Sequence, residues 1–283
     1  MTEDELRALI KAHPVEGTPE AMRAAFEALA RGAGEPDLTG LGATEGGGGK
    51  APRYLVVRPE GASVAEDAAP IVHLHGGGYV FGSPASHLGL GAELSRASGR
   101  AVVLLGYPLA PGARWPAQRD AVMAFLAALG APYVLSGDSA GGHLALSCAL
   151  GGARADALLL FSPNTSRAYG LSGTRGAPGD AMNDHETDAR LSAMAFGCVA
   201  PADPDQTLTR RELSGLPRAF VDVGTEEVLL DDTLALTTAM ARQGARVTTR
   251  VRPGFHMVQL FAAGYEPGRR SLRAAARWLS EEA

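Results

Sequence analysis

The sequence predicts an α/β fold in which a mostly parallel central sheet carries helices on both faces. Two observations lead to this prediction: short apolar runs alternate with segments of helical periodicity, and the 283 residues are enough to bury a sizeable core. The apolar runs are rich in Val, Leu and Ile and occupy residues 54–57, 71–74, 102–105, 133–135, 157–161, 219–223 and 247–251.

Helical patterns separate several of these runs, at residues 86–98, 117–129, 140–150, 231–243 and 269–281. Two further helices are expected before the first run, at residues 3–12 and from Pro19 onward. Thr18 is the expected N-cap of the second of these, and Pro19 suits its first turn. Strands that alternate with helices in this way build a parallel sheet that is covered on both sides.

Two segments interrupt the alternation. Residues 32–50 are rich in glycine, and we expect a flexible connector there. Residues 164–215 contain no clear strand and are rich in Gly, Pro, Asp and Thr. We expect residues 1–50, with their helices, and the insertion at 164–215 to form a helical cap over a core made of residues 51–163 and 216–283.

Composition excludes several classes of protein. With 46% apolar and 20% charged residues the chain is globular, and a net charge of −5 gives no reason to expect nucleic acid as a partner. The acidic N-terminus lacks the features of a secretory signal, and no run of about 18 apolar residues exists. We therefore expect a cytoplasmic protein without stable membrane association, in which Cys148 and Cys198 are free thiols.

The strongest local signal is the run Gly137-Asp138-Ser139-Ala140-Gly141. It follows an apolar run and precedes a helical pattern, which is the context of a G-x-S-x-G nucleophile elbow. The turn is so sharp that the positions two before and two after the serine must be very small. Ser139 is therefore the predicted nucleophile, and its neighbour Asp138 is expected to be a structural hydrogen-bonding residue.

A second signal, His75-Gly76-Gly77-Gly78, follows the run at 71–74. Glycines leave backbone N–H groups free to point into a cavity, and acyl transfer needs two or three such donors for the oxyanion. Because His75 sits in this loop and not after a late strand, we expect it to be structural.

The base that serves Ser139 must follow it in the chain if the order is serine, acid, histidine. Three histidines do so. His143 lies in the helix after the serine and should point away from it, and His185 lies in the insertion. His256 follows the last strand and a Pro-Gly turn, and it is the predicted base.

The acid is expected after the run at 219–223, where five carboxylates compete: Asp222, Glu226, Glu227, Asp231 and Asp232. A carboxylate in the loop just past the strand would orient the imidazole, which favours Glu226 or Glu227. Asp231 and Asp232 are expected to begin the next helix, where they suit its dipole.

Taken together, these motifs resemble the hormone-sensitive-lipase-like family of α/β-hydrolase carboxylesterases. The resemblance runs from about residue 54 to the C-terminus. It rests on His75-Gly76-Gly77-Gly78-Tyr79, Tyr107-Pro108-Leu109-Ala110-Pro111, Gly137-Asp138-Ser139-Ala140-Gly141-Gly142, Leu216-Pro217 and Gly254-Phe255-His256. It implies that the N–H groups of Gly77, Gly78 and Ala140 form the oxyanion hole, with His75, Gly76 and Asp138 as supporting residues.

The resemblance also implies which carboxylate is the acid, because the family's aspartate position holds Glu227 here. The implied activity is cofactor-free hydrolysis of small short-chain esters, and no histidine, cysteine or carboxylate cluster has metal-ligand spacing. A deacetylase, an amidase, an acyltransferase acting on a specialised metabolite, or a ligand-binding protein on the same fold are the alternatives. The oligomeric state stays open, a homodimer being one assembly that such domains form.

Overall fold

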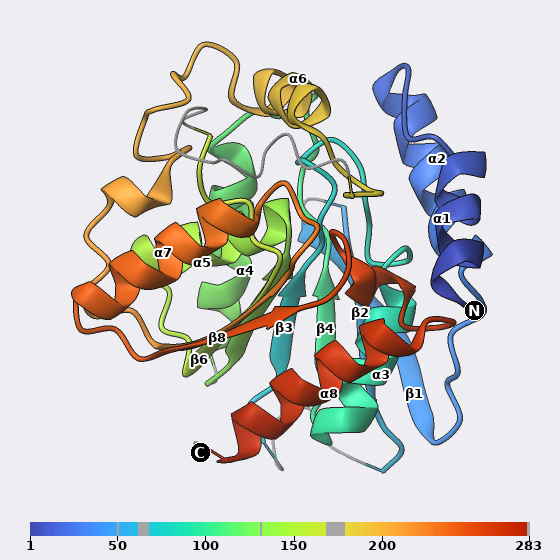
Figure 1. Ribbon diagram of the computed structural model, residues 1–283. Helices are drawn as coiled ribbons and strands as arrows, with labels where there is room; N and C mark the ends of the chain where they lie inside the picture. The colour runs from blue at the N-terminus through green and yellow to red at the C-terminus, as the bar shows by residue number, and fades with distance from the viewer. Residues whose placement is uncertain (50, 62–67, 131, 168–178, 282–283) are drawn as a thin grey trace.

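An eight-stranded sheet runs through the middle of the computed structural model (Figure 1). Its strand order is β1-β2-β4-β3-β5-β6-β7-β8; β1, β2 and β4 pair antiparallel, and all other neighbours are parallel. The strands are β1 Leu41–Gly48, β2 Ala51–Pro59, β3 Ile71–Leu74, β4 Val102–Leu105, β5 Val134–Asp138, β6 Ala157–Phe161, β7 Arg218–Gly224 and β8 Val247–Arg252. The structure describes residues 1–49, 51–61, 68–130, 132–167 and 179–281.

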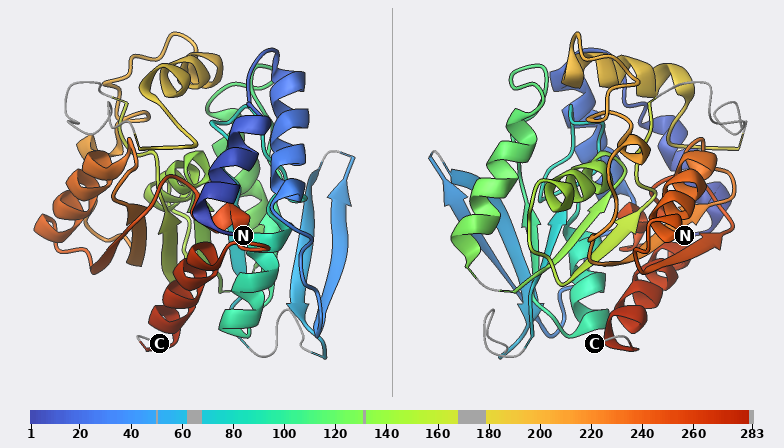
Figure 2. Two further views of the ribbon diagram at one scale, coloured as in Figure 1. Left: turned by 45° about the vertical axis from the view of Figure 1, so that its right-hand side comes forward. Right: turned by 90° about the vertical axis from the view of Figure 1, so that its left-hand side faces the viewer.

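Helices cover both faces of this sheet, as predicted (Figures 1 and 2). Alternate strand residues face opposite ways: Leu74 clusters with Leu144 on the side of α4, α5 and α7, and Ile71 clusters with Leu90 and Leu272 on the side of α3 and α8. The helices are α1 Glu3–Ala12, α2 Pro19–Gly32, α3 Leu88–Ser98, α4 Ala117–Leu129, α5 Ala140–Leu150, α6 His185–Phe196, α7 Leu230–Arg242 and α8 Glu266–Glu281.

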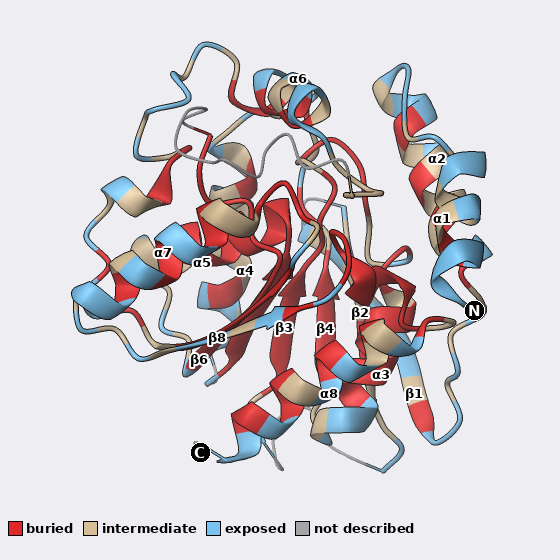
Figure 3. Cartoon of the chain, in the orientation of Figure 1, coloured by how far each residue is buried: buried red, intermediate tan, exposed pale blue. Residues whose placement is uncertain are grey.

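The central strands are buried on both faces (Figure 3). This double burial explains why the sequence shows continuous apolar runs there instead of an alternation of apolar and polar residues. Each predicted run coincides or overlaps with a strand, and the α/β fold is confirmed.

The prediction of a flexible connector is wrong for residues 41–48. These residues form β1, which pairs antiparallel with β2 from Leu41 opposite Pro59 to Gly48 opposite Ala51. Glycines carry no side chains whose alternation could reveal a strand, so the pairing partner supplies the order that local preference lacks. The strand lies at the sheet edge, and most of its residues are exposed or half-buried.

The N-terminal helices and α6 lie beyond the carboxyl ends of the parallel strands (Figure 2). The side chain of Thr18 caps α2 by accepting from the N–H of Ala21, as predicted. Part of the insertion at 164–215, namely residues 168–178, lies outside the described residues. Within the described residues no helix has the length and apolarity to cross a membrane.

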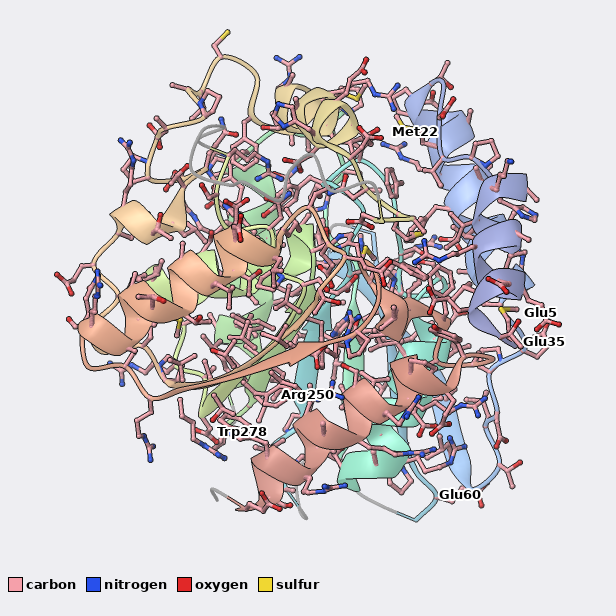
Figure 4. The ribbon with its side chains drawn as sticks, viewed as in Figure 1. Glu5, Met22, Glu35, Glu60, Arg250 and Trp278 are labelled. Atoms are coloured by element: carbon pink, nitrogen blue, oxygen red, sulfur yellow. The ribbon has the colours of Figure 1, made fainter. Side chains whose placement is uncertain are left out.

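Two smaller features complete the fold. Cys148 is buried and Cys198 exposed, and both are free thiols. Trp278 of α8 (Figure 4) donates its indole N–H to Thr248 of β8 at 3.0 Å, while the guanidinium of Arg218 lies 4.6 Å from the ring centre. These contacts fasten the last helix to the last two strands.

The docking of α2 depends on Phe26, which is fully buried and packs against Phe81 with ring centres 4.9 Å apart. We expect Phe26→Ala to reduce the free energy of unfolding by about 3 kcal/mol, because it removes buried apolar contacts and leaves a cavity. Urea denaturation followed by circular dichroism measures this loss. Leu234→Ala, at an apolar residue that is 37% exposed, is the control and should change the free energy by less than about 0.5 kcal/mol. Equal losses in the two variants would contradict the docking.

Candidate active site

Ser139 occupies the sharp turn between β5 and α5. Its backbone has φ +50° and ψ −118°, a conformation that residues other than glycine seldom adopt. A Cβ at Gly137 would lie 2.2 Å from the carbonyl oxygen of Gly141, and one at Gly141 would lie 1.9 Å from that of Leu74. Only glycine fits at either position, which is the steric requirement that the motif predicts.

The structure brings together Ser139, His256 and Glu227 from three different loops. The Nε2 atom of His256 lies 2.9 Å from Ser139 Oγ, and its Nδ1 atom lies 3.1 Å from Glu227 Oε2. All three residues are buried, Ser139 being 7% exposed. The hydroxyl, the imidazole and the carboxylate form one continuous hydrogen-bonded line.

Glu227 is held by more than the histidine. Its Oε1 atom accepts hydrogen bonds from Gly224 N at 2.6 Å, Ser162 Oγ at 2.7 Å and Arg252 Nη2 at 3.0 Å. Burial alone raises the pKa of this carboxyl, but the hydrogen bonds and charges of His256, Arg252 and Ser162 outweigh it and hold the pKa below its usual value. The carboxylate is therefore ionised, and one of its oxygens stays anchored while the other faces the imidazole.

Arg252 links this carboxylate to a second buried acid. Its Nε donates to Asp222 Oδ1 at 2.7 Å, and its Nη1 donates to the carbonyl of Phe255 at 3.2 Å. Arg250 and Gln259 also donate to Asp222. No motif in the sequence marks Arg252 or Ser162. Arg252 ends the last strand, four residues before the predicted base, and this position is the signal that could have identified it.

Two opposing effects act on His256. Burial lowers the pKa of its imidazole, but the hydrogen bond and negative charge of Glu227 raise it, with smaller contributions from Asp180 and Asp138. The net pKa lies above the ordinary value of a histidine. The ring therefore binds a proton more readily than a free imidazole does.

The other candidate histidines lie elsewhere. His143 makes a 2.6 Å hydrogen bond with the Tyr79 hydroxyl and a 3.0 Å hydrogen bond with the carbonyl of Asp205, and burial holds the pKa of its ring well below the usual value. His185 is exposed at the start of α6. The backbone N–H of His143 donates to the carbonyl of Ser139 at 3.1 Å, but its ring nitrogens bond to Tyr79 and Asp205 and not to the serine hydroxyl.

The candidate carboxylates occupy different positions in the structure. Glu226 is 39% exposed at its side chain and forms an ion pair with Arg7 at 2.7 Å, so it points away from His256. Asp231 and Asp232 lie in the first turn of α7, as expected. Of the two loop glutamates that the sequence favoured, Glu227 is the one in contact with the imidazole.

Gly77 and Gly78 of the glycine loop border the cavity in front of Ser139, and Ala140 follows the serine directly in the chain. Gly77 and Gly78 have φ values of +111° and +59°, and among the described residues their N–H groups donate to no other group. Ala140 is the first residue of α5, where an N–H has no acceptor within the helix. Gly77 and Gly78 line one cavity together with Ser139 and His256. The arrangement offers donors to negative charge that develops beside the serine.

Asp138 ties the glycine loop to the turn that bears Ser139. Its carboxylate accepts from Gly76 N at 3.0 Å and His73 Nε2 at 3.0 Å, and it lies 3.2 Å from His87 Nε2. Burial raises the pKa of Asp138, but the two histidines outweigh this effect and hold it far below its usual value. His75 stacks on Tyr107 with ring centres 4.1 Å apart and bonds to the carbonyl of Gly76. Sequence reasoning did not single out His73 or His87, and no motif marks them.

The group of His73, His87 and Asp138 also has a composition that a metal ion could use, with ligand atoms mutually within 4.8 Å. However, the Asp138 oxygens accept the N–H of Gly76, and both ring nitrogens of His73 already have partners, namely Ser136 and Asp138. A metal would have to displace these hydrogen bonds in a fully buried site. We therefore assign the group to hydrogen bonding.

The cavity in front of Ser139 has a volume of about 570 Å³. The lining that comes from the N-terminal part and the glycine loop includes the apolar residues Ile10, Val15, Phe26, Leu29 and Phe81 and the charged residues Arg7, Lys11 and Glu16. The lining that comes from the insertion includes the polar residues Asn164, Asp180, Asn183, Thr187 and Asp188 and the apolar residues Ala181, Met182 and Leu191. A ligand at Ser139 thus meets both apolar and polar side chains.

Comparisons with known proteins agree with this geometry. The family model of the alpha/beta hydrolase fold matches residues 71–259. The chain is 33% identical to an acetyl-hydrolase of Streptomyces hygroscopicus over 76% of each chain, and 26% identical to an esterase of Acinetobacter venetianus over 78% of each. The crystal structure of an esterase from the bacterial hormone-sensitive lipase family superposes with a TM-score of 0.88, at 27% identity over 99% of each chain.

The ion pair between His256 and Glu227 can be tested without an assay of activity. Nuclear magnetic resonance titration of the His256 imidazole should give a midpoint above the usual histidine value of about 6.5. Glu227→Gln should lower that midpoint, because the carboxylate that raises the pKa is gone while the burial that lowers it remains. An unaltered His256 midpoint in the variant would contradict the ion pair.

Proposed function

The chain belongs to the α/β hydrolase fold family and is a carboxylesterase of the hormone-sensitive-lipase-like group, and we propose that it hydrolyses short-chain acyl esters through Ser139, His256 and Glu227. One observation carries the assignment of residues. It is the line from Ser139 Oγ through His256 to Glu227, with separations of 2.9 and 3.1 Å, beside a cavity that the glycine loop also borders.

In the proposed mechanism, Ser139 Oγ attacks the ester carbonyl carbon while His256 Nε2 takes the hydroxyl proton. Glu227 keeps the Nδ1 proton of the imidazole in place and stabilises the cation that forms. The N–H groups of Gly77, Gly78 and Ala140 bind the oxyanion of the tetrahedral intermediate. His256 then protonates the leaving alcohol, and water attacks the acyl-enzyme with His256 again as the base.

The preference for short acyl chains is supported by the shape and chemistry of the cavity. Leu191 of α6 packs directly on the glycine loop, since a Cβ at Gly78 would lie 2.5 Å from it. A long alkyl chain directed at the insertion would have to cover Asn164, Asp180 and Asp188, whose polar groups it cannot hydrogen-bond. The name of the Streptomyces relative, an acetyl-hydrolase, agrees with a small acyl group.

The direct test is hydrolysis of p-nitrophenyl esters from acetate to palmitate by the wild type and by Ser139→Ala. We expect turnover to be highest for the short chains and to fall by about 10⁶-fold in the variant, the scale of losing a nucleophile that works with a histidine. Near-wild-type turnover by Ser139→Ala would contradict the mechanism. Unchanged thermal unfolding of the variant is the control that the fold is intact.

The glutamate in the acid position gives a second test. Glu227→Asp installs the shorter acid, but the carboxylate can then reach either the group of Ser162, Gly224 and Arg252 or the imidazole, and not both. We expect a loss of kcat of about tenfold or more, because one charge-assisted hydrogen bond is given up. Steady-state kinetics of Glu227→Asp beside Glu227→Gln measures the loss. An aspartate variant as active as the wild type would show that the site does not depend on the longer side chain.

A further inference from the structure

A half-buried carboxylate that the mechanism above does not use lies beside His256. Asp180 belongs to the insertion and borders the cavity. Its Oδ1 atom accepts from the backbone N–H of His256 at 3.3 Å and of Met182 at 3.1 Å, and its Oδ2 atom accepts from Val228 N at 3.1 Å. One side chain therefore holds the loop that carries the proposed base and the loop that carries the proposed acid.

The position of Asp180 also affects the electrostatics at the imidazole. Burial and the nearby charge of Glu227 hold the pKa of Asp180 above its usual value, and the charge of His256 and the backbone N–H groups of Met182 and Val228 oppose this shift only in part. Three acids from separate segments contribute to His256: Glu227 on the loop after β7, Asp180 in the insertion and Asp138 at the end of β5. Glu227 contacts the ring, whereas Asp180 bonds to the backbone of the same residue.

Arg7 of α1 contacts the insertion and both of these loops. Its Nη1 donates to the carbonyl of Gly179 at 2.9 Å, its Nη2 donates to Glu226 Oε2 at 2.7 Å, and its guanidinium lies 4.8 Å from the ring centre of Phe255. Gly179, Glu226 and Phe255 immediately precede Asp180, Glu227 and His256 in the chain. Arg7 thus contacts the residue that precedes each of Asp180, Glu227 and His256.

We propose that Asp180 is a positioning residue for His256, and that Arg7 locks Asp180 and the two catalytic loops into register with helix α1. This inference rests on the proposed role of His256 as the base. The insertion and the N-terminal helix then do more than enclose substrate: together they hold the base at its distance from Ser139. Separation of α1 from the core would release Gly179, Glu226 and Phe255 at once.

The test compares Asp180→Asn, which keeps the shape of the side chain and removes its charge, with the wild type across pH. We expect kcat on p-nitrophenyl acetate to fall roughly tenfold, as for one lost charge-assisted hydrogen bond, with KM little changed. We also expect the acid limb of kcat/KM to move to lower pH. A neutral imidazole is needed to accept the proton, and the negative charge that raises its pKa has been removed.

Asp184→Asn is the matched control, since Asp184 borders the same cavity but caps α6 through Thr187 and contacts no part of His256 in the described residues. Its acid limb should stay where the wild type has it. An increase in KM alone in Asp180→Asn would show that Asp180 contacts substrate, and a loss of thermal stability with unchanged kcat and acid limb would show a purely structural role. Either result overturns the proposal.

Arg7→Ala gives a second and independent test, because Arg7 is partly exposed and its replacement leaves the core intact. We expect its kcat to fall, and the double variant with Asp180→Asn to lose less than the product of the two single losses, as for residues that act as one unit. Arg7→Lys should recover part of kcat. A wild-type kcat in Arg7→Ala overturns the role of Arg7. If Asp180→Asn does not fold, the kcat of Arg7→Ala alone tests the proposal. Failure of the esterase mechanism would be seen separately, as turnover by Ser139→Ala.

Discussion

The backbone of Ser139 is the constraint on which the rest of the site depends. A residue with a side chain is held at positive φ, and it can be held there only if the chain on either side approaches closely enough to exclude every side chain but hydrogen. Gly137 and Gly141 meet that requirement by packing against each other and against β3. The same close approach places the glycine loop after β3 beside the serine, and Asp138 then joins the two through Gly76.

A second constraint comes from burying charge. Asp222, Arg252 and Glu227 lie almost completely out of water, where an unpaired charge would be very costly. Each is paired with another, and the chain of pairs runs from Asp222 through Arg252 and Glu227 to His256. The guanidinium of Arg252 lies between the two acids and forms an ion pair with each of them. The longer glutamate is accommodated because its second oxygen has three donors of its own, so no strained approach to the imidazole is required.

The sequence predicts much of this architecture because central strands and amphipathic helices reveal themselves locally. The runs at 71–74 and 157–161 coincide with β3 and β6, and the elbow could be recognised from five adjacent residues. β1 could not be predicted, because its order comes from pairing with β2 and not from its own glycine-rich composition. Asp180 and Arg7 were missed for a related reason: the contacts by which they hold the catalytic loops join residues at least 48 positions apart in sequence.

The parallel sheet supports the members of the site unequally, and the long-range contacts add support where the sheet gives least. The sheet positions Ser139 and the glycine loop directly, since both follow central strands. His256 instead follows β8 at the sheet edge, where only one neighbouring strand supports it. A base that must hold a 2.9 Å contact there needs additional fastening, and Arg252, Asp180 and Arg7 supply it from β8, the insertion and α1. Replacing these polar groups by apolar ones of the same size could leave the free energy of unfolding unchanged, because buried ion pairs add little net stability. It would still remove the directional contacts that keep the imidazole facing the serine.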